Sequence, residues 1–89
     1  ESSEERNVKV YPNPFRSSFN VEFYLSSEEQ VEIAIFDISG RQVYKRTMQR
    51  SGLVTEKIIP GREGILLLRL KIGDDIYQQR IVSAEQISP

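Results

Sequence analysis

The segment SFNVEFYL at residues 18–25 alternates apolar and polar side chains with a period of two. Because successive side chains of an extended chain point to opposite faces, Phe19, Val21, Phe23 and Leu25 share one face of a strand. Similar segments recur along the chain, separated by turns rich in Gly, Pro, Asn and Ser. We predict seven strands, at residues 8–11, 18–25, 31–37, 42–48, 53–59, 65–72 and 76–83.

The polar segments at residues 26–29 and 73–75 are short enough to reverse the chain, so we expect a hairpin at each. The composition also favours strands, since 27 of the 89 residues are Val, Ile, Phe, Tyr or Thr and only two are Ala. We therefore predict an all-β fold, a seven-stranded antiparallel immunoglobulin-like β-sandwich. An open barrel of the OB type, with about five strands, is the alternative.

The absence of Cys and His excludes thiol and imidazole catalysis, disulfides and His/Cys zinc sites. Catalysis would depend on carboxylates such as Glu22 and Glu32, but 89 residues build a thin core without a deep substrate cleft. The turn Gly73-Asp74-Asp75 offers oxygen ligands for calcium without the spacing of an EF-hand loop, so we prefer a plain hairpin turn. We expect no catalytic residue, no metal, no cofactor and no enzymatic activity.

The chain carries 12 basic and 13 acidic residues, and its net charge is −1. Residues 1–40 hold 3 basic and 8 acidic side chains, whereas residues 41–89 hold 9 basic and 5 acidic ones. Four basic residues and no acidic one lie in RQVYKRTMQR at residues 41–50. We interpret this run as a charged strand edge that resists aggregation; a patch for an acidic partner is the alternative, and we do not expect nucleic-acid binding. No apolar run is longer than the four residues at 65–68, which are too few to span a membrane.

Two corners are more specific than short strands require: PNP at residues 12–14 and DISGR at residues 37–41. With VYPNPF at 10–15, IFDISGRQV at 35–43, a Gly-led penultimate strand and a last strand ending RIV at 80–82, the sequence resembles the C-terminal sorting domain (type A) of type IX secretion cargo. Immunoglobulin-like domains related to those of flagellar hook-capping proteins share the first two motifs. They usually add a Trp-containing segment, and this chain has no Trp.

The resemblance covers about residues 8–83 and implies a set of recognition residues. Matched to the family motifs, these are Pro12, Asn13, Pro14, Asp37, Gly40, Arg41, Val43, Gly64, Arg80, Ile81 and Val82. Leu66 stands where the family often has Tyr, and residues 84–89 continue past the usual end of the family. On this basis we divide the chain into a linker from an upstream protein (1–7), the sandwich (8–83) and a C-terminal tail (84–89).

The function that the resemblance implies is that of an export signal. An outer-membrane translocon would recognise the domain on its way from the periplasm to the cell surface or the medium of a Gram-negative cell. A sortase would remove the domain while attaching the upstream cargo of the same chain to the cell surface. The alternative, from another class, is an uncleaved immunoglobulin-like interaction or spacer module of a surface protein or a secretion-machinery component. Exposed strand edges also allow a dimer formed by swapping a terminal strand.

Overall fold

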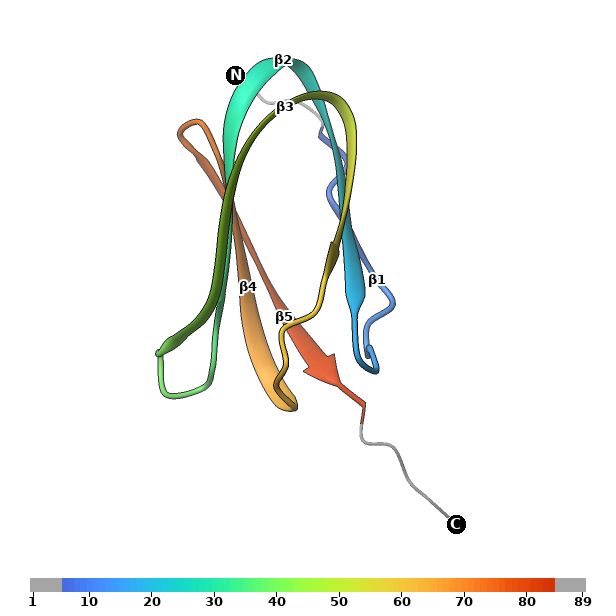
Figure 1. Ribbon diagram of the computed structural model, residues 1–89, viewed down its shortest axis with the longest axis vertical. Coiled ribbons are helices and arrows are strands. Elements are labelled where there is room, and N and C mark those ends of the chain that lie inside the picture. The colour runs from blue at the N-terminus through green and yellow to red at the C-terminus, as the bar shows by residue number, and fades with distance from the viewer. Residues whose placement is uncertain (1–5, 85–89) are drawn as a thin grey trace.

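Five β-strands run through residues 6–84, the part of the chain that the computed structural model describes (Figure 1). They are β1 (Lys9–Tyr11), β2 (Phe19–Phe36), β3 (Gln42–Ile58), β4 (Gly64–Ile72) and β5 (Asp75–Ser83). All pairs are antiparallel; the order is β1-β2-β4-β5, and β3 pairs with β2. Within the same residues no helix is long and apolar enough to cross a membrane. The prediction of an all-β antiparallel fold is confirmed.

The turn predicted at 26–29 and the gap predicted between the strands at 42–48 and 53–59 are parts of longer strands, which is why residues 6–84 contain five strands and not the predicted seven. Residues 26–29 continue β2 and residues 50–52 continue β3, because the two strands stay paired on both sides of these points. A register shift between Leu25 and Glu29 gives β2 extra residues there and bends both strands together. The hairpin predicted at 26–29 is therefore wrong, whereas the hairpin predicted at 73–75 joins β4 to β5.

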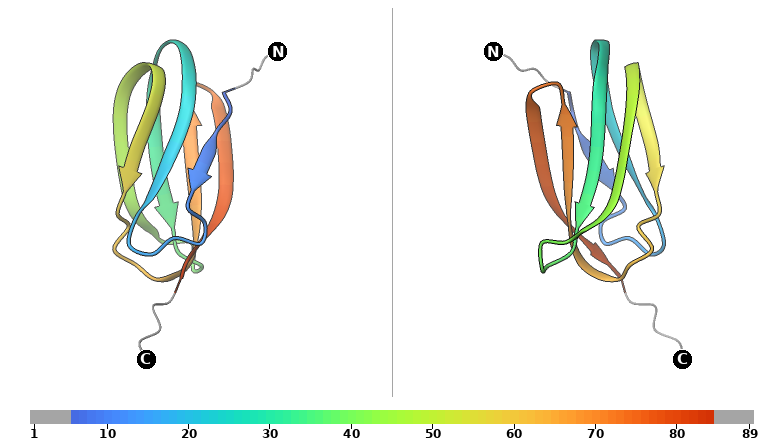
Figure 2. Two further views of the ribbon diagram at one scale, coloured as in Figure 1. Left: turned by 90° about the vertical axis from the view of Figure 1, so that its right-hand side faces the viewer. Right: turned by 60° about the vertical axis from the view of Figure 1, so that its left-hand side comes forward.

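The bend folds the sheet over on itself, so that its two halves face each other (Figure 2). The first half of β2 pairs with β1 and the end of β3, and its second half pairs with β4 and the start of β3. Through β4, β5 extends the second half. Inward side chains from both halves form one buried core, made of Phe15, Phe19, Val21, Phe23, Leu25, Val31, Ile33, Ile35, Val54, Ile58, Leu66, Leu68, Leu70, Ile72 and Ile81.

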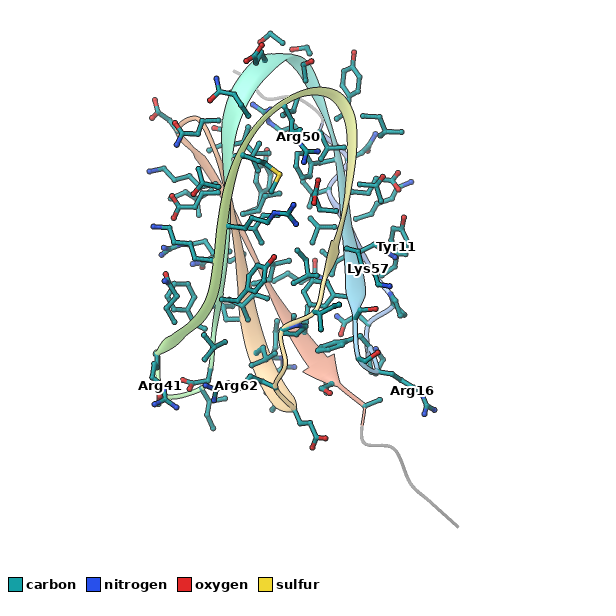
Figure 3. All side chains as sticks on the ribbon, in the orientation of Figure 1. Tyr11, Arg16, Arg41, Arg50, Lys57 and Arg62 are labelled. Atoms are coloured by element: carbon teal, nitrogen blue, oxygen red, sulfur yellow. The ribbon has the colours of Figure 1, made fainter. Side chains whose placement is uncertain are left out.

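A buried carboxylate connects the two halves along β3. Glu56, near the end of this strand, is only 8% exposed. Its carboxylate oxygens lie 3.1 Å from Nη1 of Arg46 and 2.7 Å from Nη1 of Arg50. Arg46 comes from the first half of β3 and Arg50 from the bend, where Figure 3 shows it inside the arch of the strand. β3 is the edge strand on one side of the curled sheet, because it pairs only with β2. On that side these three side chains connect the two halves of the sheet, and we call them the Glu56 brace.

Candidate functional site

The proline corner holds the end of β5. The side-chain amide of Asn13 donates a hydrogen bond to the carbonyl of Arg80 (3.2 Å) and accepts one from the N–H of Val82 (3.1 Å). The pairing continues at Phe15, whose N–H donates to the carbonyl of Val82 (2.9 Å). The carbonyl of Phe15 in turn accepts from the N–H of Ala84 (2.6 Å). This set of contacts, the Asn13 clamp, joins the beginning of the domain to the end of its last strand.

The turn between β2 and β3 is organised by Asp37. One carboxylate oxygen accepts hydrogen bonds from the Ser39 hydroxyl (2.6 Å) and from the N–H groups of Ser39 and Arg41 (3.0 Å each). Led by the bond from the Ser39 hydroxyl, these hydrogen bonds lower the pKa of Asp37 from 3.8 to about 2. Gly40 has a φ of 90°, in the left-handed region that favours glycine. The turn is thus fixed by its own residues, and it presents Ile38 with 84% of its surface exposed.

Apolar side chains are exposed where this turn meets β4 and β5. Phe36 pairs with Leu67, and Leu67 pairs with Arg80, so the turn lies beside the start of β4 and the end of β5. Two adjoining hollows of about 110 and 490 Å³ open there. Together they are lined by Phe36, Asp37, Ile38, Gly40, Ile65, Leu66, Leu67, Arg69, Gln78 and Arg80. We call this region the Ile38 surface.

The Ile38 surface is basic as well as apolar. The guanidinium carbon of Arg69 lies 4.8 Å from the centroid of the Phe36 ring, a cation–π contact. Among residues 6–84, no carboxylate lies within ion-pair distance of Arg69 or Arg80. Figure 3 shows two further arginines, Arg16 and Arg62, at the same end of the molecule.

The sequence matches the model of a known protein family over most of its length. Residues 9–84 match the model of the family described as the secretion system C-terminal sorting domain. The chain belongs to this family. Searches of curated proteins and of solved structures gave no match. The resemblance seen in the sequence is confirmed, and the domain is a type IX secretion sorting signal, which directs export through the outer membrane.

The sorting domain brings several sequence-predicted recognition residues together at one end. Asp37, Gly40 and Arg80 line the Ile38 surface. Asn13 reaches the same stretch of β5 from the other side through the clamp. Gly64, with a φ of 97°, begins β4 directly opposite the end of β5. Motifs that are far apart in the sequence therefore meet around the last residues of β5.

Other predicted residues of the sorting domain have different positions. Ile81 is 0% exposed, so its side chain is not available to a partner. Val43, on β3, is partly buried and packs against the core. Val82 is half-buried. Pro12 and Pro14 are exposed and flank Asn13, where their rings restrict the backbone of the corner.

Sequence reasoning missed the exposed apolar residues Ile38, Ile65 and Leu67. A signal for two of them was present in the segment ILLLRLKI at residues 65–72. If its even-numbered residues face the core, the apolar side chains of Ile65 and Leu67 must point outward, because the period of a strand is two. Apolar side chains on the outer face of a strand point to an interaction surface, whereas apolar side chains on its inner face indicate only the core.

The basic run at residues 41–50 of the sorting domain is neutralised by its own neighbours. Each of its four basic side chains pairs with a carboxylate: Arg41 with Asp37, Lys45 with Glu32, and Arg46 and Arg50 with Glu56. This arrangement agrees with a charged strand edge and leaves little free charge for an acidic partner. In the described part of the chain, no three His, Cys, Asp or Glu side chains gather in a way that could hold a metal ion.

Proposed function

We propose that the outer-membrane translocon recognises the sorting domain through the Ile38 surface. The proposal is supported by the meeting of three separate segments there: the turn at residues 37–41, the start of β4 and the end of β5. Ile38, Ile65 and Leu67 are 84%, 47% and 37% exposed. Large apolar side chains exposed in one place are typical of interaction sites, and unpaired arginines beside them favour an acidic rim on the partner.

The Asn13 clamp has an indirect role in this proposal. Arg80 contributes its side chain to the Ile38 surface and its carbonyl to the clamp. Asn13 therefore acts as a positioning residue that holds β5, while Arg80 contacts the translocon. The recognised object is the folded domain, and we propose that the curled sheet, whose two halves enclose one core, is a form of the immunoglobulin-like sandwich.

After recognition, we propose, a sortase removes the sorting domain and attaches the cargo to the cell surface. The family resemblance motivates this step, and the shape of the domain is compatible with it. Arg6 lies at the β4–β5 turn, where it contacts Asp75, whereas the Ile38 surface lies at the opposite end of β4 and β5. Translocon and sortase can thus act at separate ends of the domain.

Charge reversal on the Ile38 surface tests the recognition step. A reporter fused upstream of the sorting domain is expected in the medium or on the cell surface with the native domain, and in the periplasm with the double variant Arg69→Glu/Arg80→Glu. The matched control is Lys57→Glu, an exposed basic residue on the other half of the sheet, which Figure 3 shows on the side away from Arg41. Normal export of the double variant would exclude the Ile38 surface as the recognised site.

The same experiment must separate recognition from folding. Removal of residues 80–89 also removes Ile81, a core residue, and the partners of the Asn13 clamp, so loss of export after this truncation has two explanations. The charge-reversal variants avoid this ambiguity because they remove no core residue and leave the backbone partners of the Asn13 clamp in place. Equal circular dichroism spectra and melting temperatures of the purified native and variant domains establish that export, and not folding, has changed.

The second candidate function is an uncleaved interaction or spacer module. It is favoured by the positions of Arg6 and Ala84, which lie beside the first residue and just after the last residue of β5, because a domain entered at one end and left at the other can stand in series between neighbouring domains. The mass of the mature parent protein distinguishes the two functions: a sorting signal processed by a sortase is missing from it, and a spacer is retained. A swapped dimer would additionally require the Asn13 clamp to open, and light scattering of the purified domain measures the oligomeric state.

A further inference from the structure

Arg6 is bound to the folded domain through both its backbone and its side chain. Its carbonyl accepts a hydrogen bond from the N–H of Tyr24 on β2 (3.0 Å). Its guanidinium donates to the carboxylates of Glu29 (3.4 Å) and Asp75 (3.1 Å). Only 16% of the Arg6 side chain is exposed. We call these contacts the Arg6 latch; they tie the chain before β1 to the bend of β2 and to the first residue of β5.

Neighbouring residues are shaped to accommodate the latch. A Cβ atom on Gly73 would lie 3.0 Å from Oε1 of Glu29, so glycine at this position leaves room for the carboxylate that binds Arg6. Asn7 has a φ of 50°, a left-handed conformation that Asn adopts more readily than most residues. The chain therefore turns directly after Arg6 and enters β1. These contacts attach Arg6 to the folded domain.

We propose that the Arg6 latch sets the C-terminal limit for proteolytic processing: an enzyme that separates this sorting domain from its cargo cuts on the N-terminal side of Arg6. The physical reason is that a protease needs the residues around the scissile bond to leave the fold and enter its active site. At the Arg6–Asn7 bond this requires breaking two ion pairs and one backbone hydrogen bond. The proposal rests on the sorting function proposed above, since it concerns removal of the domain from a cargo.

Limited trypsin digestion of the 89-residue protein, followed by mass spectrometry, tests the latch. Trypsin requires an Arg or Lys side chain in its specificity pocket, so cleavage after Arg6 reports how often the latch opens. Arg62, exposed in the loop between β3 and β4, provides an internal reference for an accessible bond. We expect cleavage after Arg6 to be slower than cleavage after Arg62. The double variant Glu29→Gln/Asp75→Asn should accelerate cleavage after Arg6 by roughly 10-fold, relative to Arg62.

The residues that directly precede Glu29 and Asp75 in the sequence provide a matched control. Glu28→Gln/Asp74→Asn makes the same change of charge at exposed positions that do not contact Arg6, and should leave the rate of cleavage after Arg6 unchanged. Native cleavage after Arg6 as fast as after Arg62, or equal acceleration in both double variants, would overturn the proposal. If Glu29→Gln/Asp75→Asn unfolds the domain, hydrogen exchange of the Tyr24 amide in the single variant Asp75→Asn decides instead: faster exchange supports the latch and unchanged exchange contradicts it.

The position of the cut is tested separately from export of the reporter. In cells that export the reporter, a released domain fragment that retains Arg6 supports the limit, and a fragment that begins after Arg6 contradicts it. A reporter that is exported without any cleavage argues against sortase processing, while the trypsin experiment still decides whether the latch protects the bond. Failure of export in the Ile38 surface variants bears on recognition alone.

Discussion

Asp37 shows at the scale of one residue how a turn motif acts. Its carboxylate accepts three hydrogen bonds within the turn, and its pKa falls from 3.8 to about 2. Because this pKa is lower in the folded protein than in the unfolded chain, the ionised carboxylate stabilises the fold. The contribution is complete above the unfolded value, and it is lost as the pH falls from about 4 through about 2.

Replacement of Asp37 should therefore have an effect that depends on pH. We expect Asp37→Asn to lower the melting temperature at pH 7, and the difference from the native protein to shrink as the pH falls from 4 toward 2. Thermal unfolding followed by circular dichroism at several pH values measures this difference. Asp74→Asn, in the exposed turn between β4 and β5, is the control for loss of a turn carboxylate. A difference that stays constant between pH 7 and pH 2 contradicts the role assigned to the Asp37 carboxylate.

At the scale of elements, the Asn13 clamp makes the end of β5 depend on a residue outside any strand. Asn13→Ala removes both hydrogen bonds to β5, and we expect the free energy of unfolding to fall by about 1 kcal/mol, since each exposed hydrogen bond contributes modestly. Asn13→Asp keeps an acceptor for the N–H of Val82 but places an oxygen where the amide donated to the carbonyl of Arg80, so its effect should be at least as large. Urea denaturation gives these free energies.

Asn20 on β2 provides the comparison for this series. In the part of the chain described, its side chain makes no hydrogen bond, so Asn20→Ala should change the free energy of unfolding by less than about 0.5 kcal/mol. Equal effects of Asn13→Ala and Asn20→Ala would show that the clamp does not stabilise β5.

The core-facing side chains at residues 19–25 and 66–72 were predictable from the sequence, because the alternation there directly reports which side chains point inward. Residues 26–29 could not be interpreted correctly, because a polar segment is compatible both with a reversing turn and with a solvated bend. The choice depends on whether β3 remains paired across the bend, which is a property of two segments and not of one. For the same reason the sequence indicated that Asn13 was special without showing that its partners are Arg80 and Val82.

For the whole molecule, the Glu56 brace keeps the two halves of the curled sheet together. Glu56→Gln leaves Arg46 and Arg50 without their common partner. Since these arginine side chains are 46% and 39% exposed and can turn toward water, we expect a loss of about 1–2 kcal/mol, less than for a fully buried ion pair. Urea denaturation measures the loss, and Glu28→Gln, an exposed carboxylate on the bend of β2, serves as the control. A stability equal to that of Glu28→Gln would mean that apolar packing alone holds the halves together.

The Asn13 clamp also determines when the domain becomes complete. It joins residues 69 positions apart in the sequence, and one of its two sides is the last part of the domain to leave the ribosome. Contacts of such large sequence separation form late in folding, because the loop between them must close first. A domain that is broken or unfinished therefore lacks the ordered end of β5, and a signal that depends on this end becomes readable only when the whole domain has been made.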